Sequence, residues 1–183
     1  MRIISGSHKG RRIKAPKNLP VRPTTDMAKE ALFNILRNQV ELHGLRVLEL
    51  FSGSGNMSYE FCSRGAANVV AVDQHLPCVD FVKTTAQELE FPIDAIKADV
   101  FTFLKQHKGN YDLIFADPPY ALETEEFYQI IDSVFKQELL QEENDEMYAG
   151  VLIIEHSKHT DLSDHDRFDN QRRYGGTVFS FFK

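Results

Sequence analysis

Residues 45–55 read Leu45-Arg46-Val47-Leu48-Glu49-Leu50-Phe51-Ser52-Gly53-Ser54-Gly55, an apolar run that ends in two closely spaced glycines. The run Leu45–Phe51 predicts a buried strand, because short apolar segments bounded by turn residues are typical of one. The segment Ser52–Gly55 predicts a loop, since glycines allow tight turns and close approach of the backbone to a ligand. A helix through about Arg64 follows, and its first N–H groups would face that ligand.

The alternation of strands and helices continues through the rest of the chain. Further strands are expected at Asn68–Asp73, Ile93–Ala98, Tyr111–Ala116 and Gly150–Glu155, and helices at Pro77–Leu89, Val100–His107 and Thr124–Leu140. Phe168–Tyr174 and Thr177–Phe182 flank Gly175-Gly176, which is a hairpin signal. The pattern predicts an α/β protein with a doubly wound, mostly parallel, Rossmann-like sheet of seven strands and a C-terminal antiparallel hairpin.

Charge is segregated along the chain, although the formal net charge is only −6. Residues 1–46 carry ten basic and three acidic residues, a net charge of +7, whereas the remainder carries eleven basic and 24 acidic residues, a net charge of −13. A basic segment on an acidic protein points to a polyanion partner at one end of the molecule. The alternative is a solvated arm that binds nothing.

Residues 1–23 are expected to form a small basic N-terminal arm, ahead of a main domain at residues 24–183. Arg2–Gly6 and Arg11–Lys14 predict two short extended pieces of a hairpin. Three prolines between residues 16 and 23 make the following link stiff and non-helical. The next helix is expected to begin at Thr24-Thr25-Asp26, whose side chains suit an N-cap.

Composition excludes several classes of protein. At 183 residues, with 42% hydrophobic and 26% charged residues, the chain is typical of a globular domain. No apolar run approaches the roughly 20 residues that span a bilayer, and the N-terminus lacks the apolar region of a secretory signal. Cys62 and Cys78 lack C-x-x-C spacing, which favours reduced thiols in a cytoplasmic protein. His156 and His159 are expected in a surface loop, and no histidine spacing indicates a metal site.

Two further strands are expected to end in acidic residues. Ligands of open α/β sheets bind outside the carboxyl ends of the strands. Asp73 comes 20 residues after Gly53, where a carboxylate can accept hydrogen bonds from ribose hydroxyls, and Asp99 is placed to meet an adenine edge. With the glycine loop, these acids predict a cofactor that contains adenosine. The alternative for each acid is a helix N-cap.

The glycine loop favours S-adenosylmethionine over a nicotinamide dinucleotide. The dinucleotide fingerprint has Gly or Ala as its third small residue, whereas this chain has Ser58. Glu49 would also place negative charge near a pyrophosphate. The same carboxylate suits a ligand that carries an ammonium and a sulfonium group.

A second motif, Asp117-Pro118-Pro119-Tyr120, follows the strand expected at Tyr111–Ala116. Proline has no N–H to donate and its ring fixes φ, so the two prolines end the strand. The carboxylate and a backbone carbonyl could accept from an exocyclic amine, and the ring of Tyr120 could stack on a nucleobase. The alternative is a proline-stiffened turn with an incidental aromatic side chain.

Together these motifs resemble the bacterial RsmD family of 16S ribosomal RNA guanine-N2 methyltransferases, which are class I, S-adenosylmethionine-dependent enzymes. The resemblance covers nearly the whole chain. It rests on these segments: Arg2–Gly6 with Lys9-Gly10-Arg11, Arg22–Asp26 with Glu30–Asn34, Leu48–Gly55, Ser63–Ala66 and Asp117–Tyr120. The chain departs from the family pattern at Asn56-Met57, at His75 and at Tyr59–Cys62.

The resemblance implies a role for each matching residue. The catalytic motif that would hold the target guanine is Asp117, Pro118, Pro119 and Tyr120. The residues expected to bind the cofactor are Glu49, Phe51, Ser52, Gly53, Gly55, Asp73, Gln74, Asp99 and Val100. The residues expected to contact nucleic acid are Arg2, Lys9, Arg11, Arg12, Lys14, Arg22 and Thr24. The partner implied is ribosomal RNA or a small-subunit assembly particle.

Three alternative functions remain open on the residues alone. An amino-methyltransferase acting on adenine N6 or cytosine N4 of DNA or another RNA fits the motif at 117–120, but the chain has no room for a separate target-recognition domain. A nicotinamide-dependent oxidoreductase is disfavoured by Glu49 and Ser58. A non-catalytic RNA-binding assembly factor is disfavoured because the glycine loop, both acids and the catalytic motif are intact.

Overall fold

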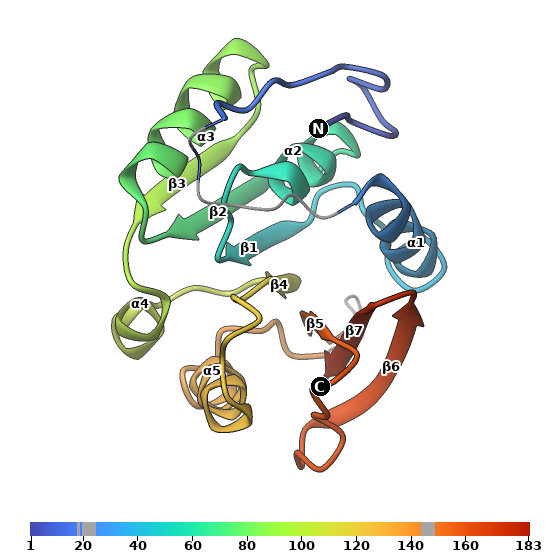
Figure 1. Cartoon of the computed structure of the whole chain (residues 1–183), viewed down its shortest axis with the longest axis vertical. Helices are drawn as coiled ribbons and strands as arrows, with labels where there is room; N and C mark the ends of the chain where they lie inside the picture. Colours follow the sequence, from blue (N-terminus) through green and yellow to red (C-terminus); the bar gives the residue numbers. More distant parts are fainter. Residues whose placement is uncertain (18, 20–24, 144–148) are drawn as a thin grey trace.

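The computed structural model describes residues 1–17, 19, 25–143 and 149–183. Within these residues, seven strands form one sheet in the order β3-β2-β1-β4-β5-β7-β6 (Figure 1). The strands are β1 (Arg46–Leu50), β2 (Asn68–Asp73), β3 (Ile93–Lys97), β4 (Leu113–Ala116), β5 (Val151–Ser157), β6 (Phe168–Tyr174) and β7 (Thr177–Phe182). Strands β1 to β5 are parallel, whereas β7 pairs antiparallel with β5 and β6. The predicted sheet and its C-terminal hairpin are confirmed.

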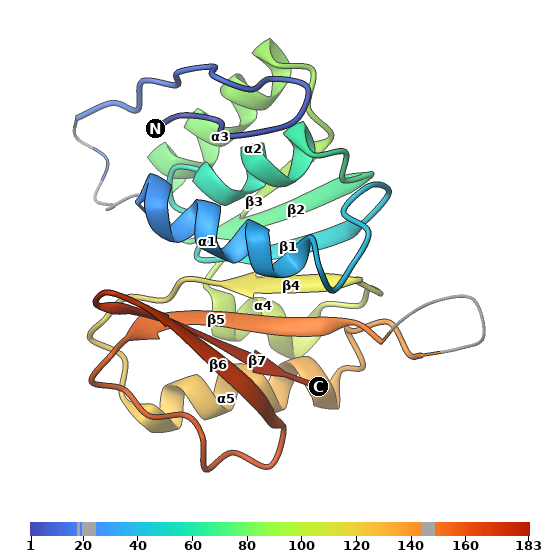
Figure 2. The ribbon, with the colours of Figure 1, turned by 90° about the vertical axis from the view of Figure 1, so that its right-hand side faces the viewer.

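Helices cover both faces of the sheet (Figures 1 and 2). One face packs against α1 (Asp26–Leu36), α2 (Asn56–Ser63) and α3 (Leu76–Glu88), and the other against α4 (Val100–Gln106) and α5 (Thr124–Lys136). Neighbouring strand residues take opposite sides, since side chains alternate along a strand. Phe115 packs with α1 and α2, for example, whereas Ile114 packs with α5.

Residues 1–14 form the expected hairpin, called the basic hairpin below. Its two sides are joined by backbone hydrogen bonds, of 2.9 Å from Ile3 N to Arg11 O and of 3.0 Å from Ile13 N to Met1 O. Ile3 and Ile13 are buried against Tyr59 of α2, so the hairpin is packed onto the domain. The predicted boundary at residue 23 lies outside the described residues and stays a prediction.

A buried ionic cluster attaches the basic hairpin to α1 and α2. The carboxylate of Glu60 accepts hydrogen bonds from Ile4 N at 2.8 Å, from Ser5 N at 3.0 Å and from Arg64 Nε at 2.8 Å. Lys29 Nζ lies 3.4 Å from the same carboxylate and donates to Arg2 O at 2.7 Å. Burial lowers the pKa of Lys29, and the charge of Glu60 partly offsets this effect. Removing one member of such a buried pair typically costs about 3–5 kcal/mol, so the hairpin is a fixed part of the fold.

Three expectations about local structure are wrong, two about where an element begins or ends and one about His156. The helix expected to extend to Leu140 ends at Lys136, because Glu138 takes a left-handed conformation (φ 52°) and the chain then turns to bury Leu139. The fourth strand begins at Leu113, since Tyr111 forms only an isolated bridge with Leu140.

His156 does not lie in a surface loop, as the sequence suggested. It belongs to β5, which runs on to Ser157, and its side chain is fully buried. Its ring nitrogens contact Ser180 Oγ at 2.8 Å and Ser157 O at 2.9 Å. Burial lowers the pKa of His156. Because both ring nitrogens contact atoms of the sheet, the residue is a structural side chain of the sheet.

The helices in the described part of the chain are all too short or too polar to cross a membrane.

Candidate active site

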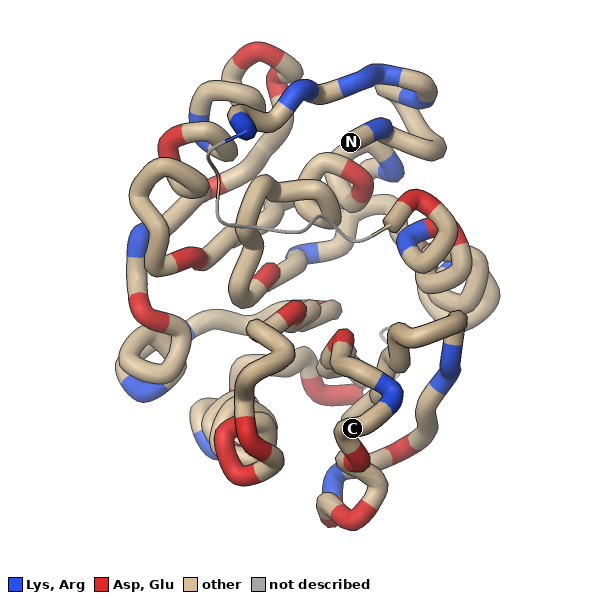
Figure 3. The backbone as a smooth tube through the Cα atoms, in the orientation of Figure 1, with Lys and Arg blue, Asp and Glu red and all other residues tan. Residues whose placement is uncertain are grey.

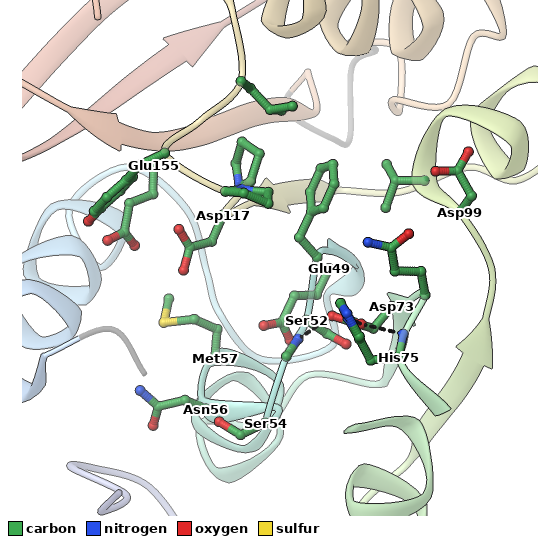
Figure 4. A pocket seen from close by; sticks show the side chains of 18 of the residues that line it. Glu49, Ser52, Ser54, Asn56, Met57, Asp73, His75, Asp99, Asp117 and Glu155 are labelled. Carbon is green, nitrogen blue, oxygen red and sulfur yellow. Dashed lines mark hydrogen bonds and ion pairs between the residues drawn. The ribbon is translucent and has the colours of Figure 1, made fainter. Parts of the chain in front are cut away.

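A cavity of about 480 Å³ lies at the carboxyl ends of β1, β2, β4 and β5 (Figure 4). Its volume falls within the roughly 300–1,000 Å³ of small-molecule sites. All predicted catalytic and cofactor residues except Gly55 line it: Glu49, Phe51, Ser52, Gly53, Asp73, Gln74, Asp99, Val100, Asp117, Pro118, Pro119 and Tyr120. The topology therefore brings together two motifs that are far apart in the sequence, the glycine loop at 52–55 and the motif at 117–120.

The alternation of side chains along the strands explains why four carboxylates meet here. Glu49, Asp73, Asp117 and Glu155 each follow, by two residues, a side chain packed against α1, α2 or α3. Because the strand period is two residues, all four point to that same face of the sheet. Figure 4 shows Glu49, Asp117 and Glu155 directed into the shared space.

Asp73 anchors the glycine loop to the end of β2. One of its carboxylate oxygens accepts from Gly53 N at 2.8 Å, and the other accepts from His75 N at 2.8 Å. The ring of His75 also lies 3.1 Å from it. A carboxylate offers about four acceptor positions, so capacity for a ligand hydroxyl remains.

Gly55 and Asp99 have structural roles that the sequence left open. Gly55 is the N-cap of α2 with φ of 78°, and a Cβ atom there would lie 2.9 Å from the ring of Tyr59. Asp99 is the N-cap of α4, since its carboxylate accepts from Thr102 N at 2.9 Å. Asp99 also lines the cavity, so capping and ligand contact are compatible at this residue.

Glu49 is one of the buried acids that line the cavity. Burial raises its pKa to about 8, an effect that hydrogen bonds from Ser58 reduce and the nearby charge of Asp73 increases. A carboxyl group with this pKa is mostly protonated at neutral pH. A cation bound beside it would favour the ionised form, so the site is suited to a positively charged ligand.

The 117–120 motif forms both a turn and a wall of the cavity. Asp117 N donates to Leu50 O at 3.3 Å, which extends the β1–β4 ladder by one step, and Leu122 N donates to Pro119 O at 3.1 Å. Asp117 is half-buried and Pro118 is buried, whereas Tyr120 is 61% exposed. The ring of Tyr120 therefore lies at the cavity wall with much of its surface exposed to solution.

The basic hairpin begins at the edge of the cavity. Two lining residues connect the cavity to the hairpin. The hydroxyl of Ser54 contacts the sulfur of Met1. The side-chain oxygen of Asn56 accepts from Lys29 Nζ, which also donates to Arg2 O. Lys9, Arg11, Arg12 and Lys14 are exposed, whereas Arg2 pairs with Asp26 at 3.4 Å. Figure 3 shows basic residues concentrated along this segment. Arg22 and Thr24 lie outside the described residues.

The cavity itself is acidic. Five acidic side chains line it, of which Glu49 is mostly protonated at neutral pH. Among the described lining residues, His75 is the one that could carry a positive charge. Phosphate groups would therefore be repelled from the cavity but attracted to the hairpin beside it. The described residues contain no cluster of three or more His, Cys, Asp or Glu side chains that could hold a metal ion.

Sequence reasoning missed Glu155, which is 3% exposed and lines the cavity beside Asp117. A usable signal was present, because Glu155 ends an apolar run as Asp73 and Asp117 do. Asn56, a departure from the family pattern, also lines the cavity, and its bond to Lys29 explains a polar residue there.

Replacement of Glu49 by Gln should stabilise the ligand-free protein at pH 8 and change its stability little at pH 4. The folded-state pKa is about 8, whereas an unfolded Glu titrates near 4.3. Unfolding thus releases a proton between these values, and the free energy of unfolding of the wild type falls as pH rises through them. The amide does not titrate, so the variant should gain up to about 4 kcal/mol by pH 8, at about 1.4 kcal/mol per pKa unit.

Thermal unfolding across that pH range measures the difference. The exposed Glu30→Gln variant is the matched control and should follow the wild type. Parallel curves of melting temperature against pH for Glu49→Gln and the wild type would show that Glu49 titrates normally.

Comparisons with known proteins give the family. The model described as "Conserved hypothetical protein 95" matches residues 1–183. A Bacillus subtilis protein named "Putative rRNA methyltransferase YlbH" is 32% identical over 169 residues, which are 88% of this chain and 85% of that protein. The Escherichia coli "Ribosomal RNA small subunit methyltransferase D" is 30% identical over 121 residues, which are 66% of this chain and 60% of that protein.

Solved structures share the fold at lower identity. A structure described as "Putative methyltransferase yhhF from Escherichia coli" has a TM-score of 0.80 at 22% identity, and the match covers 100% of this chain and 96% of that one. Another match is a T. thermophilus 16S rRNA N2 methyltransferase, RsmC, in complex with AdoMet and guanosine. Its TM-score is 0.70 at 18% identity, and the match covers 90% of this chain and 45% of the RsmC chain. The fold is that of class I methyltransferases, and the chain belongs to the family described as Conserved hypothetical protein 95, the RsmD family.

Proposed function

We propose that this protein transfers a methyl group from S-adenosylmethionine to the exocyclic N2 amine of a guanine in small-subunit ribosomal RNA. The observation that carries the proposal is the pairing of two groups in one cavity. Glu49, which suits a cation, lies on β1, and Asp117, which suits an amine, follows the adjacent β4. A methyl donor and an amine acceptor would meet between them.

The cofactor fits the β1–β2 side of the cavity. When bound, S-adenosylmethionine supplies a methyl group activated by the positive charge of its sulfonium. Glu49 would face its charged end, and burial would strengthen that attraction. Asp73 would accept from the ribose hydroxyls, and Asp99 with Val100 would contact the adenine at the start of α4.

The substrate amine fits the β4 side. The lone pair of guanine N2 is delocalised into the ring, so the amine is a weak nucleophile. Asp117 and the carbonyl of Pro118 would accept from its two N–H groups and favour the pyramidal nitrogen that attacks. Tyr120 would stack on the base, and good alignment can contribute roughly 7–11 kcal/mol to lowering the barrier.

The charge distribution favours RNA as the source of the base. A single base can enter the acidic cavity while its phosphates remain outside, on the basic hairpin. A paired base would have to leave its stack, at a cost of a few kcal/mol, which a loop nucleotide largely avoids. The names of the matched relatives support ribosomal RNA as the substrate, although the aligned region covers only 60–64% of those named small subunit methyltransferase D.

Asp117→Ala should lower the methyl-transfer rate at least about 100-fold and leave the affinity for S-adenosylmethionine within about threefold, because the residue faces the amine rather than the cofactor. Transfer of labelled methyl groups to small-subunit RNA measures the first effect, and calorimetric titration measures the second. A folded variant that loses cofactor binding and transfer to the same extent would refute the role given to Asp117.

Charge reversal on the basic hairpin should weaken RNA binding without affecting cofactor binding. We expect the triple substitution of Lys9, Arg11 and Arg12 by Glu to reduce the slope of log affinity against log salt by about two, since each lost phosphate contact contributes about 0.7–0.9. The matched control reverses Lys105, Lys108 and Lys136, which lie on and beside α4 and α5, and Figure 1 shows these helices away from the hairpin. Equal salt slopes for the two triple variants would argue against the hairpin as the RNA contact.

A further inference from the structure

We infer that Glu155 makes the site selective for guanine, because its carboxylate accepts a hydrogen bond from the ring N1–H of the base. The inference deepens the proposed function and rests on it. The motif at 117–120 does not by itself distinguish guanine from adenine or cytosine, since each base carries an exocyclic amine. A second group must therefore recognise the ring atom next to that amine.

The sheet register places Glu155 beside Asp117. Ala116 of β4 pairs with Ile154 of β5, so the two acids are the next residues on neighbouring parallel strands. Such strands lie about 4.8 Å apart. Phe115 and Ile153, two residues earlier, both pack against α1 and α2, so the two carboxylates share one face of the sheet (Figure 4).

The chemistry of the two carboxylates matches guanine. Its N1–H and N2 amine are neighbouring donors on one edge, and two neighbouring acceptors face them. Adenine and cytosine present a lone pair on the ring nitrogen next to the amine, and that lone pair would face the carboxylate of Glu155. Sites built to hydrogen-bond a substrate N–H reject analogues that lack it by factors of up to about 10⁴–10⁵.

Burial and rigidity make Glu155 suitable for this selection. The residue is 3% exposed, so a lone pair placed against it could not be compensated by water. It also lies within β5, whose backbone is paired with β4 on one side and with β7 on the other, where Glu155 is opposite Phe179. The carboxylate is therefore held by a paired strand rather than by a loop.

The test uses 2-aminopurine, which keeps the 2-amine of guanine but has a lone pair at N1. A small-subunit RNA fragment carries either guanine or 2-aminopurine at the methylated position, and kcat/KM is measured for wild type and Glu155→Gln. We expect the wild type to prefer guanine at least about 100-fold, and the variant, whose amide can donate to N1, to reduce that preference at least about tenfold. The exposed Glu30→Gln variant is the control and should keep the wild-type preference.

A binding measurement separates selection from structural support. The fluorescence of 2-aminopurine riboside reports its affinity for each protein with S-adenosylhomocysteine present, and guanosine serves as the competitor. Glu155→Gln should bind guanosine more weakly and 2-aminopurine riboside at least as tightly as the wild type. A merely structural residue would weaken both ligands alike.

An unchanged ratio of guanine to 2-aminopurine, in transfer and in binding, would overturn the role of Glu155. A wild-type protein that methylates no guanine would instead refute the proposed function. In that case the two nucleoside affinities would still decide whether Glu155 recognises N1–H.

Discussion

The parallel pairing of β1 with β4 is the constraint on which the site depends. These strands lie side by side although β2 and β3 intervene in the sequence. The chain therefore continues from β1 toward the β3 edge of the sheet and from β4 toward the β6 edge. A crevice opens where the strand order reverses in this way. The register that aligns Leu50 with Ala116 places the glycine loop against the 117–120 motif, and the alternation of side chains turns Glu49 and Asp117 to one face.

Two buried glutamates of this fold illustrate the difference between a structural and a functional carboxylate. Glu60 is surrounded by Lys29, Arg64 and two backbone N–H groups, which together hold the basic hairpin in place. Glu49 is equally inaccessible but is hydrogen-bonded by Ser58 and opens onto the cavity, and its pKa rises to about 8. A buried acid whose pKa is raised and that lines a cavity is typical of a functional site, and the cation of a methyl donor would favour its ionised form.

Most of the fold followed from the sequence because strands and helices alternate and several strands, among them β2, β4 and β6, end at or directly before an acid or a glycine. The end of α5 was missed because a left-handed conformation at Glu138 is a local choice that helix periodicity does not report. His156 was misplaced because β5 continues two residues beyond the expected end at Glu155 to pair with β7. Glu155 was missed although it ends an apolar run as Asp73 and Asp117 do, because its neighbour Asp117 is distant in sequence and the β4–β5 register brings the two together.

Nucleoside mass spectrometry of small-subunit ribosomal RNA, from cells with and without this protein, examines the proposed reaction at its product. Loss of N2-methylguanosine from one position, restored when the wild-type protein is returned, is the predicted result. Unchanged N2-methylguanosine together with loss of a methylated adenine or cytosine would contradict the selection of guanine by paired carboxylates. An unaltered set of modified nucleosides would contradict methyl transfer to this RNA altogether.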